Sequence, residues 1–261
     1  MGSESILTGL ESSIFTDILI LMARTARLVI PNMPHHIIQS GNDRQSIFRD
    51  DADYLAFQAW LKDAARQFRV ALHAYVLLPN QVHLLATPVD ETGLARMMQW
   101  VGRYYVPYFN QKYSRSGTLW QGRFKTSVIE SEQYFLPCSR YIEMKPVRTG
   151  LAANPADYRW SSFAHHVGDR PDSMITDHPL YWGMGNTPFE REAAYKAWIL
   201  QPVPDGELDA LSSAVAKGWA LGSDEFKIAL ERRTSRRVRP GKKGRPRKQA
   251  DGQSAEPSLG G

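Results

Sequence analysis

Apolar side chains recur at intervals of three or four residues in three stretches of the chain, the pattern of amphipathic helices. The first stretch predicts a helix over Asp51–Phe68, and the second predicts one running from Leu94 to Tyr108. The third predicts a helix over Ser131–Met144, which Pro146 should end because proline lacks the amide hydrogen that a helix needs.

Short apolar runs bounded by turn residues predict the strands. The order of elements is strand, helix, two strands, helix, strand, helix, which is the split arrangement of a ferredoxin-like α+β sandwich. We therefore expect an antiparallel sheet with helices packed on one face. The predicted strands are His35–Gln39, Val70–Leu78, Gln81–Thr87, Thr118–Trp120 and Lys125–Ile129.

The segments on either side of these elements have a weaker pattern of apolar and polar residues. We expect residues 1–23 to be a non-structural extension, with Met22 an alternative to Met1 as the start of the chain. Residues 24–166 form the predicted core domain, and residues 167–233 form an irregular, partly helical extension. Residues 234–261 are expected to be a basic disordered tail.

Composition and charge exclude several classes of protein. The chain has 43% apolar and 23% charged residues and a single cysteine, Cys138, which excludes an intramolecular disulfide framework. The longest N-terminal apolar run, Ile18–Ala23, is far shorter than the roughly 20 residues that span a bilayer. We expect a soluble cytoplasmic protein with no membrane partner. The net charge of +5 indicates a polyanionic partner, which would make the protein nucleoid-associated.

The C-terminal tail carries most of this positive charge. Eleven Lys and Arg residues lie between Lys227 and Lys248, against one acid, Glu231. Within this block, the segment from Lys243 to Lys248 resembles an AT-hook, whose arginines enter narrow A·T minor grooves. A non-specific DNA anchor is the alternative interpretation of Lys243, Arg245 and Arg247.

Two features of the core could carry chemistry. Side chains alternate along a strand, so Gln81 and His83 should share one sheet face while Val82 enters the other. On the third predicted helix, Tyr141 lies between Arg140 and Arg148, and a tyrosine beside cations can attack phosphorus. Taken alone, both features are also typical of ordinary packing. The pairs His35-His36 and His165-His166 are expected in edge-strand and surface positions.

A resemblance to a known family gives these residues a specific meaning. The segment from Arg24 to about His166 resembles the REP-associated tyrosine transposases, within the single-tyrosine branch of the His-hydrophobe-His nucleases. The blocks that carry the resemblance are Leu28–Pro31, Gly41–Arg44, His73–Leu85, Gly117–Lys125, Ser139–Leu151 and Trp160–Phe163.

The resemblance implies single-stranded DNA cleavage and joining near a hairpin. In that chemistry two histidines and a third ligand from the tyrosine helix hold Mg²⁺ or Mn²⁺, which polarises the scissile phosphate. The tyrosine attacks and leaves a 5′-phosphotyrosine link and a free 3′-OH. Single-stranded or hairpin DNA is the implied partner, and a monomer or a homodimer is expected.

Mapped onto this chain, Tyr141 falls on the nucleophile and His83 on the second histidine of the family pattern. Gln81 replaces the first histidine, and Lys145 stands where the family places an amide side chain. Three interpretations follow. The metal is held weakly by His83, Gln81 and Glu143; or Lys145 supplies part of the metal's charge; or catalysis is lost and a DNA-binding protein remains.

Basic and aromatic residues around these blocks are the expected DNA contacts, because cations neutralise phosphates while aromatic rings stack on bases. An RNA-binding module is the third functional alternative, since ferredoxin-like sheets also bind RNA. The predicted contacts are Trp120, Arg123, Lys125, Arg140, Lys145, Arg148, Lys243, Arg245 and Arg247.

Overall fold

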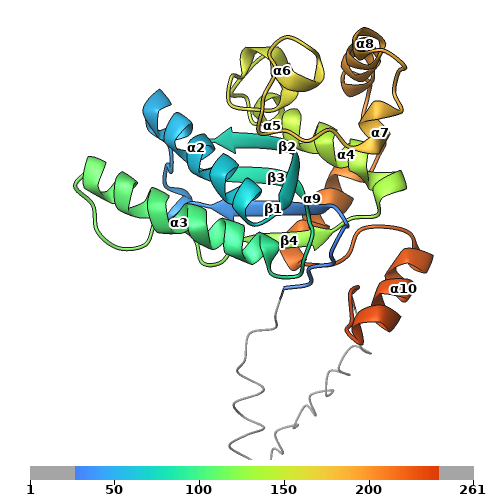
Figure 1. The fold of residues 1–261 in the computed structure, drawn as a ribbon, viewed down its shortest axis with the longest axis horizontal. Helices are drawn as coiled ribbons and strands as arrows, with labels where there is room; N and C mark the ends of the chain where they lie inside the picture. Colours follow the sequence, from blue (N-terminus) through green and yellow to red (C-terminus); the bar gives the residue numbers. More distant parts are fainter. Residues whose placement is uncertain (1–26, 241–261) are drawn as a thin grey trace, which may run out of the picture.

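A computed structural model describes residues 27–240, and a four-stranded antiparallel sheet lies at its centre (Figure 1). The strands are β1 (His35–Ser40), β2 (Val70–Leu78), β3 (Gln81–Pro88) and β4 (Lys125–Val128). Their order across the sheet is β2-β3-β1-β4, and every neighbouring pair is antiparallel. This is the strand order of the ferredoxin-like sandwich, so the predicted fold class is confirmed.

Two long helices cover one face of the sheet, as predicted. Helix α2 (Asp51–Gln67) begins at Asp50, whose carboxylate accepts from the amide of Asp53. Helix α3 (Gly93–Lys112) continues through Pro107 for five more residues. Both helices bury their apolar stripes against this face of the sheet, and the shared core includes Ile37, Phe57, Leu84 and Tyr105.

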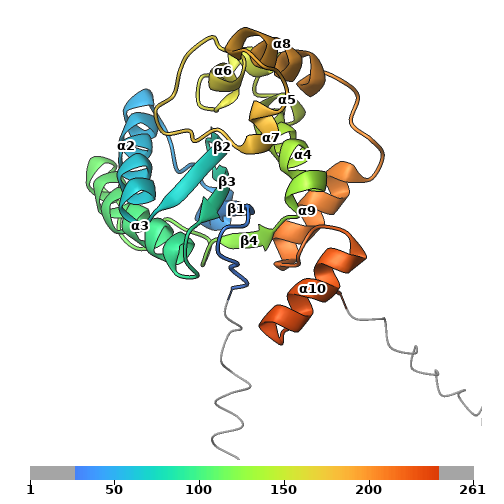
Figure 2. The same ribbon diagram turned by 45° about the vertical axis from the view of Figure 1, so that its right-hand side comes forward.

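The opposite face of the sheet is also covered. Helices α4 (Ser131–Glu143) and α9 (Glu207–Lys217) lie on this side, and Figure 2 shows the sheet between the two helical layers. Their core includes Val76, Leu85, Ile142 and Leu211. The expectation of helices on one face therefore holds for α2 and α3 and is incomplete for the chain, because α4 packs against the second face.

The segment before β4 differs from its prediction. Thr118–Trp120 was expected to be a strand, but Trp120 makes only a single bridge to Gly41. Gly117 and Gly122 flank it with φ angles of 83° and 64°, a left-handed conformation that interrupts a strand. The segment is thus a loop that leads into β4.

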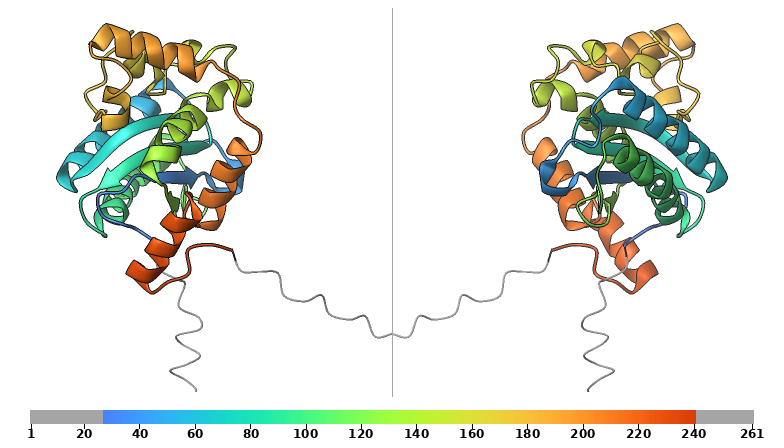
Figure 3. Two further views of the ribbon diagram at one scale, coloured as in Figure 1. Left: turned by 90° about the vertical axis from the view of Figure 1, so that its right-hand side faces the viewer. Right: turned by 90° about the vertical axis from the view of Figure 1, so that its left-hand side faces the viewer.

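The remainder of the described chain wraps around this sandwich. A short helix α5 (Lys145–Arg148) follows α4 directly, so Pro146 ends the long helix without ending helical structure. Beyond it lie the 3-10 turn Pro155–Asp157, α6 (Phe163–His166), α7 (Pro179–Trp182), α8 (Pro188–Ile199) and α10 (Asp224–Thr234); a further 3-10 turn, Asn42–Arg44, follows β1. Figure 3 shows α8 and α10 at opposite ends of the molecule. No helix within residues 27–240 is long and apolar enough to cross a membrane.

Gly41 fixes the turn at the end of β1. Its amide donates to the carbonyl of Asn80, 2.9 Å away, and it bridges to Trp120. A Cβ at this position would lie 2.3 Å from the carbonyl oxygen of Gln45, a backbone atom that cannot turn aside. The turn therefore needs glycine for space.

We expect Gly41→Ala to lower the free energy of unfolding by about 1–3 kcal/mol, the usual cost of forcing an extra carbon into a packed site. Urea denaturation monitored by circular dichroism measures this change. Gly183→Ala is the matched control, because its Cβ would meet only ordinary contacts at 3.5 Å or more. Equal stabilities of the two variants would contradict the assignment.

Candidate functional site

The site begins with two side chains on β3. Gln81 and His83 point toward α4, while Val82 between them enters the core under α2 and α3, as the alternation predicts. Gln81 Oε1 and His83 Nε2 are 2.8 Å apart and form a hydrogen bond. The Gln81 amide also donates to Ser40 Oγ at 2.9 Å. Both side chains are therefore held in place by the sheet itself.

His36 on β1 extends this arrangement across the sheet. Its Nε2 lies 3.0 Å from His83 Nδ1, and the two rings stack with centroids 5.3 Å apart. An amide oxygen can only accept, so His83 Nε2 carries the proton and His83 Nδ1 accepts from His36 Nε2. Among the described residues, His36 Nδ1 has no hydrogen-bond partner and is buried.

The expectation of an edge-strand position for His36 was wrong, since β1 is a central strand and His36 is 1% exposed.

Tyr141 packs on this pair from the opposite layer. It lies on α4 with 5% of its surface exposed, and its ring meets His36 edge to face with centroids 5.4 Å apart. Lys145 Nζ donates to the Tyr141 hydroxyl at 3.3 Å, so the residue one turn later shares its face as predicted. The Arg148 guanidinium lies 4.5 Å from the centre of the ring and bonds to the Tyr141 carbonyl.

These surroundings keep both imidazoles neutral. Burial, assisted by the charge of Lys145, lowers the pKa of His36 from 6.5 to about 3. Burial also lowers the pKa of His83 well below its ordinary value, with further contributions from His36, Lys145 and Arg148. The Tyr141 hydroxyl thus lies beside the Lys145 ammonium group, and its ring lies between the Arg148 guanidinium and two uncharged imidazoles.

Residues 29–145 match the family model described as "Transposase IS200 like". The segment belongs to the IS200-like transposase family. This IS200-like segment contains β1 to β4, Tyr141 and Lys145, and the family match supports a role in DNA transposition. No curated protein matches the chain.

Two solved structures show similarity at low identity. One is titled "Structure of the REP associates tyrosine transposase bound to a REP hairpin"; it has 18% identity and a TM-score of 0.46, and the match covers 60% of this chain and 92% of that one. The other is a putative transposase from Deinococcus radiodurans R1, with 23% identity and a TM-score of 0.32, over 44% of this chain and 92% of that one.

IS200-like transposases generally use a divalent metal. Whether this site fits such an ion depends on the side-chain atoms that could coordinate it. The two expected donors, His83 Nε2 and Gln81 Oε1, are uncharged and bonded to one another. The charged neighbours that act on His83 are Lys145 and Arg148, which would repel a cation. Within residues 27–240, no cluster of three or more His, Cys, Asp or Glu side chains could hold a metal ion. The residues present do not fit a divalent cation.

Glu143, the expected third metal ligand, lies elsewhere. Its carboxylate is fully buried and accepts from Tyr195 at 2.7 Å and from Ser162, and it pairs with His166 at 2.7 Å. Residues 141 and 143 are about 200° apart around a helix, so the two side chains point in nearly opposite directions. The structure does not bring Glu143 together with Gln81 and His83, and the surface position expected for His166 was wrong.

Arg140 is likewise an internal residue. Its guanidinium forms an ion pair with Glu207 at 2.7 Å and lies 4.6 Å from the centre of the Trp198 ring. Its side chain is 5% exposed, so it ties α4 to α9 and is not available to DNA. Arg140 is therefore removed from the expected contacts. Lys243, Arg245 and Arg247 lie outside the described residues.

The loop before β4 brings the other expected contacts together. Trp120 lines a cavity of about 660 Å³ between α3 and the loop, together with Arg27, Arg103 and Arg123. Lys125 is exposed at the start of β4, beside a neighbouring cavity that shares Arg123. The Gln121 amide donates to the carbonyl of Ser40, whose hydroxyl accepts from Gln81. The loop and Gln81 therefore meet at the end of β1, while Trp120 packs into the α2–α3 layer and Tyr141 lies in the layer on the opposite face of the sheet.

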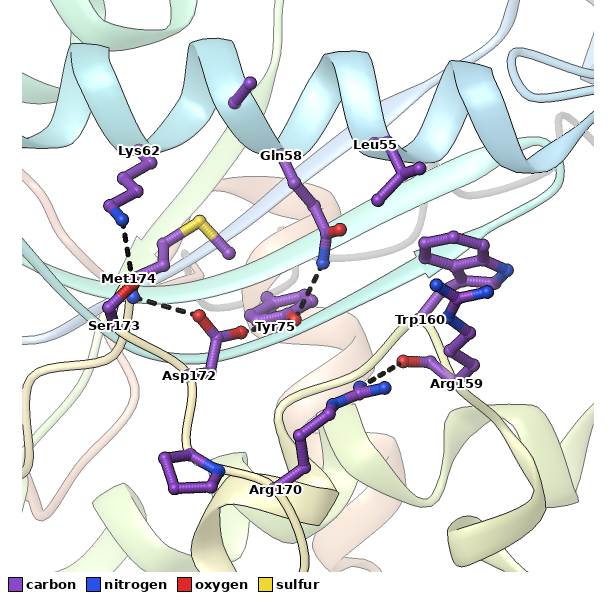
Figure 4. A pocket seen from close by; sticks show the side chains of 12 residues that line it. Leu55, Gln58, Lys62, Tyr75, Arg159, Trp160, Arg170, Asp172, Ser173 and Met174 are labelled. Carbon is purple, nitrogen blue, oxygen red and sulfur yellow. Dashed lines mark hydrogen bonds between the residues drawn. The ribbon is translucent and has the colours of Figure 1, made fainter.

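A separate cavity of about 300 Å³ lies between α2 and the segment 159–174 (Figure 4). Its polar groups bond to one another: Asp172 accepts from Tyr75 at 2.7 Å, and Lys62 donates to Ser173 at 2.7 Å. Arg170 donates to the carbonyl of Arg159. The hydrogen bonds that line this cavity join the segment 159–174 to the core of the fold.

The neutral, buried His36 gives the stability a pH dependence. Its folded pKa lies below the unfolded value of 6.5, so its contribution is fully present above pH 6.5 and is lost as pH falls toward 3. Between pH 6.5 and 5 this side chain should remove about 2 kcal/mol from the free energy of unfolding. Urea denaturation of wild type and His36→Phe at both pH values measures the difference. An unchanged pH dependence in the variant would show that His36 does not stay neutral.

Proposed function

We propose that the chain cleaves and rejoins single-stranded DNA beside hairpin-bearing repeats through a 5′-phosphotyrosine intermediate on Tyr141. The observation that carries the proposal is the placement of Tyr141, whose hydroxyl lies 3.3 Å from Lys145 Nζ and whose ring centre lies 6.1 Å from that of His83. A phenol oxygen held beside an ammonium group is suited to attack on a phosphodiester, because the positive charge stabilises the negative charge of the transition state.

The sheet supplies the rigidity that such an attack requires. His36 packs against the edge of the Tyr141 ring and is itself bonded to His83, which is bonded to Gln81. A nucleophile fixed against a bonded row of side chains loses little freedom when substrate binds. Tyr141 would donate the attacking oxygen, and Lys145 and Arg148 would contact the oxygens of the phosphate.

The loop before β4 is the proposed binding surface for the unpaired strand. Trp120 offers an aromatic ring in a cavity large enough for a nucleobase, and Arg103 and Arg123 line the same cavity. Aromatic stacking combined with phosphate neutralisation is the usual mode of single-strand binding. Because this loop contacts Ser40, which contacts Gln81, a strand seated here would pass around the end of β1 to reach Tyr141 on the opposite face of the sheet.

A DNA-binding protein without catalysis is the second candidate function. The observation that favours it is the misfit between the site and a divalent cation, since the family generally uses a metal. In that case the positive groups around Tyr141 would bind phosphate without reaction.

Tyr141→Phe separates the two functions, because it removes only the attacking oxygen. Wild type incubated with a labelled hairpin-bearing oligonucleotide should form a covalent adduct that survives denaturing electrophoresis, and the variant should form none. Tyr134→Phe is the matched control, since Tyr134 lies on the same helix and packs against the same apolar cluster as Tyr141. An adduct that persists in Tyr141→Phe would exclude Tyr141 as the nucleophile.

Arg123→Gln tests the binding surface. A lost phosphate contact should weaken single-stranded DNA binding for every sequence and reduce the slope of log affinity against log salt by about 0.7. Fluorescence anisotropy at several salt concentrations measures both quantities. Arg66→Gln, an exposed arginine on α2, serves as the control of equal charge change. Identical salt slopes for the two variants would exclude Arg123 as a phosphate contact.

A further inference from the structure

Tyr141 is accompanied by two permanent cations. Lys145 Nζ lies 3.3 Å from its hydroxyl and 5.2 Å from the centre of its ring, and the Arg148 guanidinium lies 4.5 Å from that centre. Together the two side chains carry a formal charge of +2, which equals the charge of the ion that related enzymes use. Charge for the transition state is therefore already present in the chain.

His83, which falls on a metal ligand of the family, has both ring nitrogens in hydrogen bonds. His83 Nε2 donates to Gln81 Oε1, and His83 Nδ1 accepts from His36 Nε2. A metal at His83 would need the lone pair of Nε2, where the proton now is, so binding would break the contact with Gln81. It would also have to approach Lys145, a group of the same charge.

We propose that Lys145, assisted by Arg148, takes the part of the divalent cation, so that the chain forms and resolves its tyrosine–DNA bond without a metal. This inference rests on the proposed function and deepens it. The ammonium group holds the phenol oxygen in its attacking position and then contacts a non-bridging phosphate oxygen. Arg148 presents planar N–H donors, which match phosphate geometry, to a second oxygen.

The step balances within the chain and its substrate. Tyr141 Oη forms a bond to phosphorus while the bond between phosphorus and the 3′ oxygen breaks. The phenol loses its proton, and the departing 3′ oxygen gains one and leaves as a 3′-OH. The reverse reaction, attack by a 3′-OH on the phosphotyrosine, restores the phenol and the phosphodiester. No oxidant, reductant or further reactant is needed.

Adduct formation by the purified full-length chain in EDTA and in Mn²⁺ tests the inference. Wild type should form the adduct at equal rates in both. Lys145→Asn should lower the rate on the order of 10²-fold, the cost of removing one charge-stabilising group. Lys145→Arg should restore most of it. Lys196→Asn, an exposed lysine on α8, is the control for the change in net charge.

Metal binding supplies a readout that does not depend on activity. The electron paramagnetic resonance signal of free Mn²⁺ should be unchanged by wild type. The double variant Gln81→His/Lys145→Asn replaces the amide with an imidazole and removes the repelling charge, so it should deplete the free Mn²⁺ signal. Its adduct formation should then require Mn²⁺, and adding His83→Ala should abolish the binding.

The outcomes distinguish the inference from the function on which it rests. An adduct that EDTA abolishes and Mn²⁺ restores would overturn the metal-free inference and leave the proposed function standing. Mn²⁺ binding by wild type would likewise overturn the metal-free inference and leave the proposed function standing, if His83→Ala removed that binding. No adduct in any condition, with folding verified by circular dichroism, would overturn both. Equal rates in EDTA and Mn²⁺, together with the loss in Lys145→Asn, would support both.

Discussion

The row of hydrogen bonds from His36 through His83 to Gln81 is the constraint around which the site is organised. Each bond in the row determines the next, because an amide oxygen accepts only and a neutral imidazole has one donor and one acceptor. The row runs across two central strands, so its geometry is as rigid as the sheet. Because α4 packs over the row, the imidazoles of His36 and His83 are buried and uncharged. The Tyr141 ring packs against the fixed ring of His36.

The two histidines are buried because helices cover both faces of the sheet. A ferredoxin-like sheet with helices on one side would leave His36 and His83 in water, where they could titrate and turn. Here α4 and α9 form a second apolar layer, and the ion pair between Arg140 and Glu207 joins them. Arg140 was predicted to be a DNA contact from its position beside Tyr141, but it stabilises the packing of α4, the helix that carries Tyr141.

Local patterns in the sequence predicted much of the fold and part of the site. Alternation along β3 correctly placed Gln81 and His83 on one face, and helical spacing placed Lys145 beside Tyr141. His36 was missed because its role depends on strand order, which no local pattern contains. Glu143 could have been excluded from the sequence, because a residue two positions from Tyr141 lies on the far side of a helix. The structural role of Arg140 could not be predicted from local sequence, because its ion-pair partner, Glu207, is 67 residues away.

Glu143 also bears on how much of the chain forms one folding unit. The family match ends at residue 145, yet the three side chains that satisfy the Glu143 carboxylate, Ser162, His166 and Tyr195, all come from later in the chain. A fragment cut at the family boundary would strip a buried carboxylate of every one of these partners, a loss that typically costs several kcal/mol. The buried surroundings of Glu143 therefore extend through α8. The region beyond the family segment is a structural part of the domain that carries Tyr141.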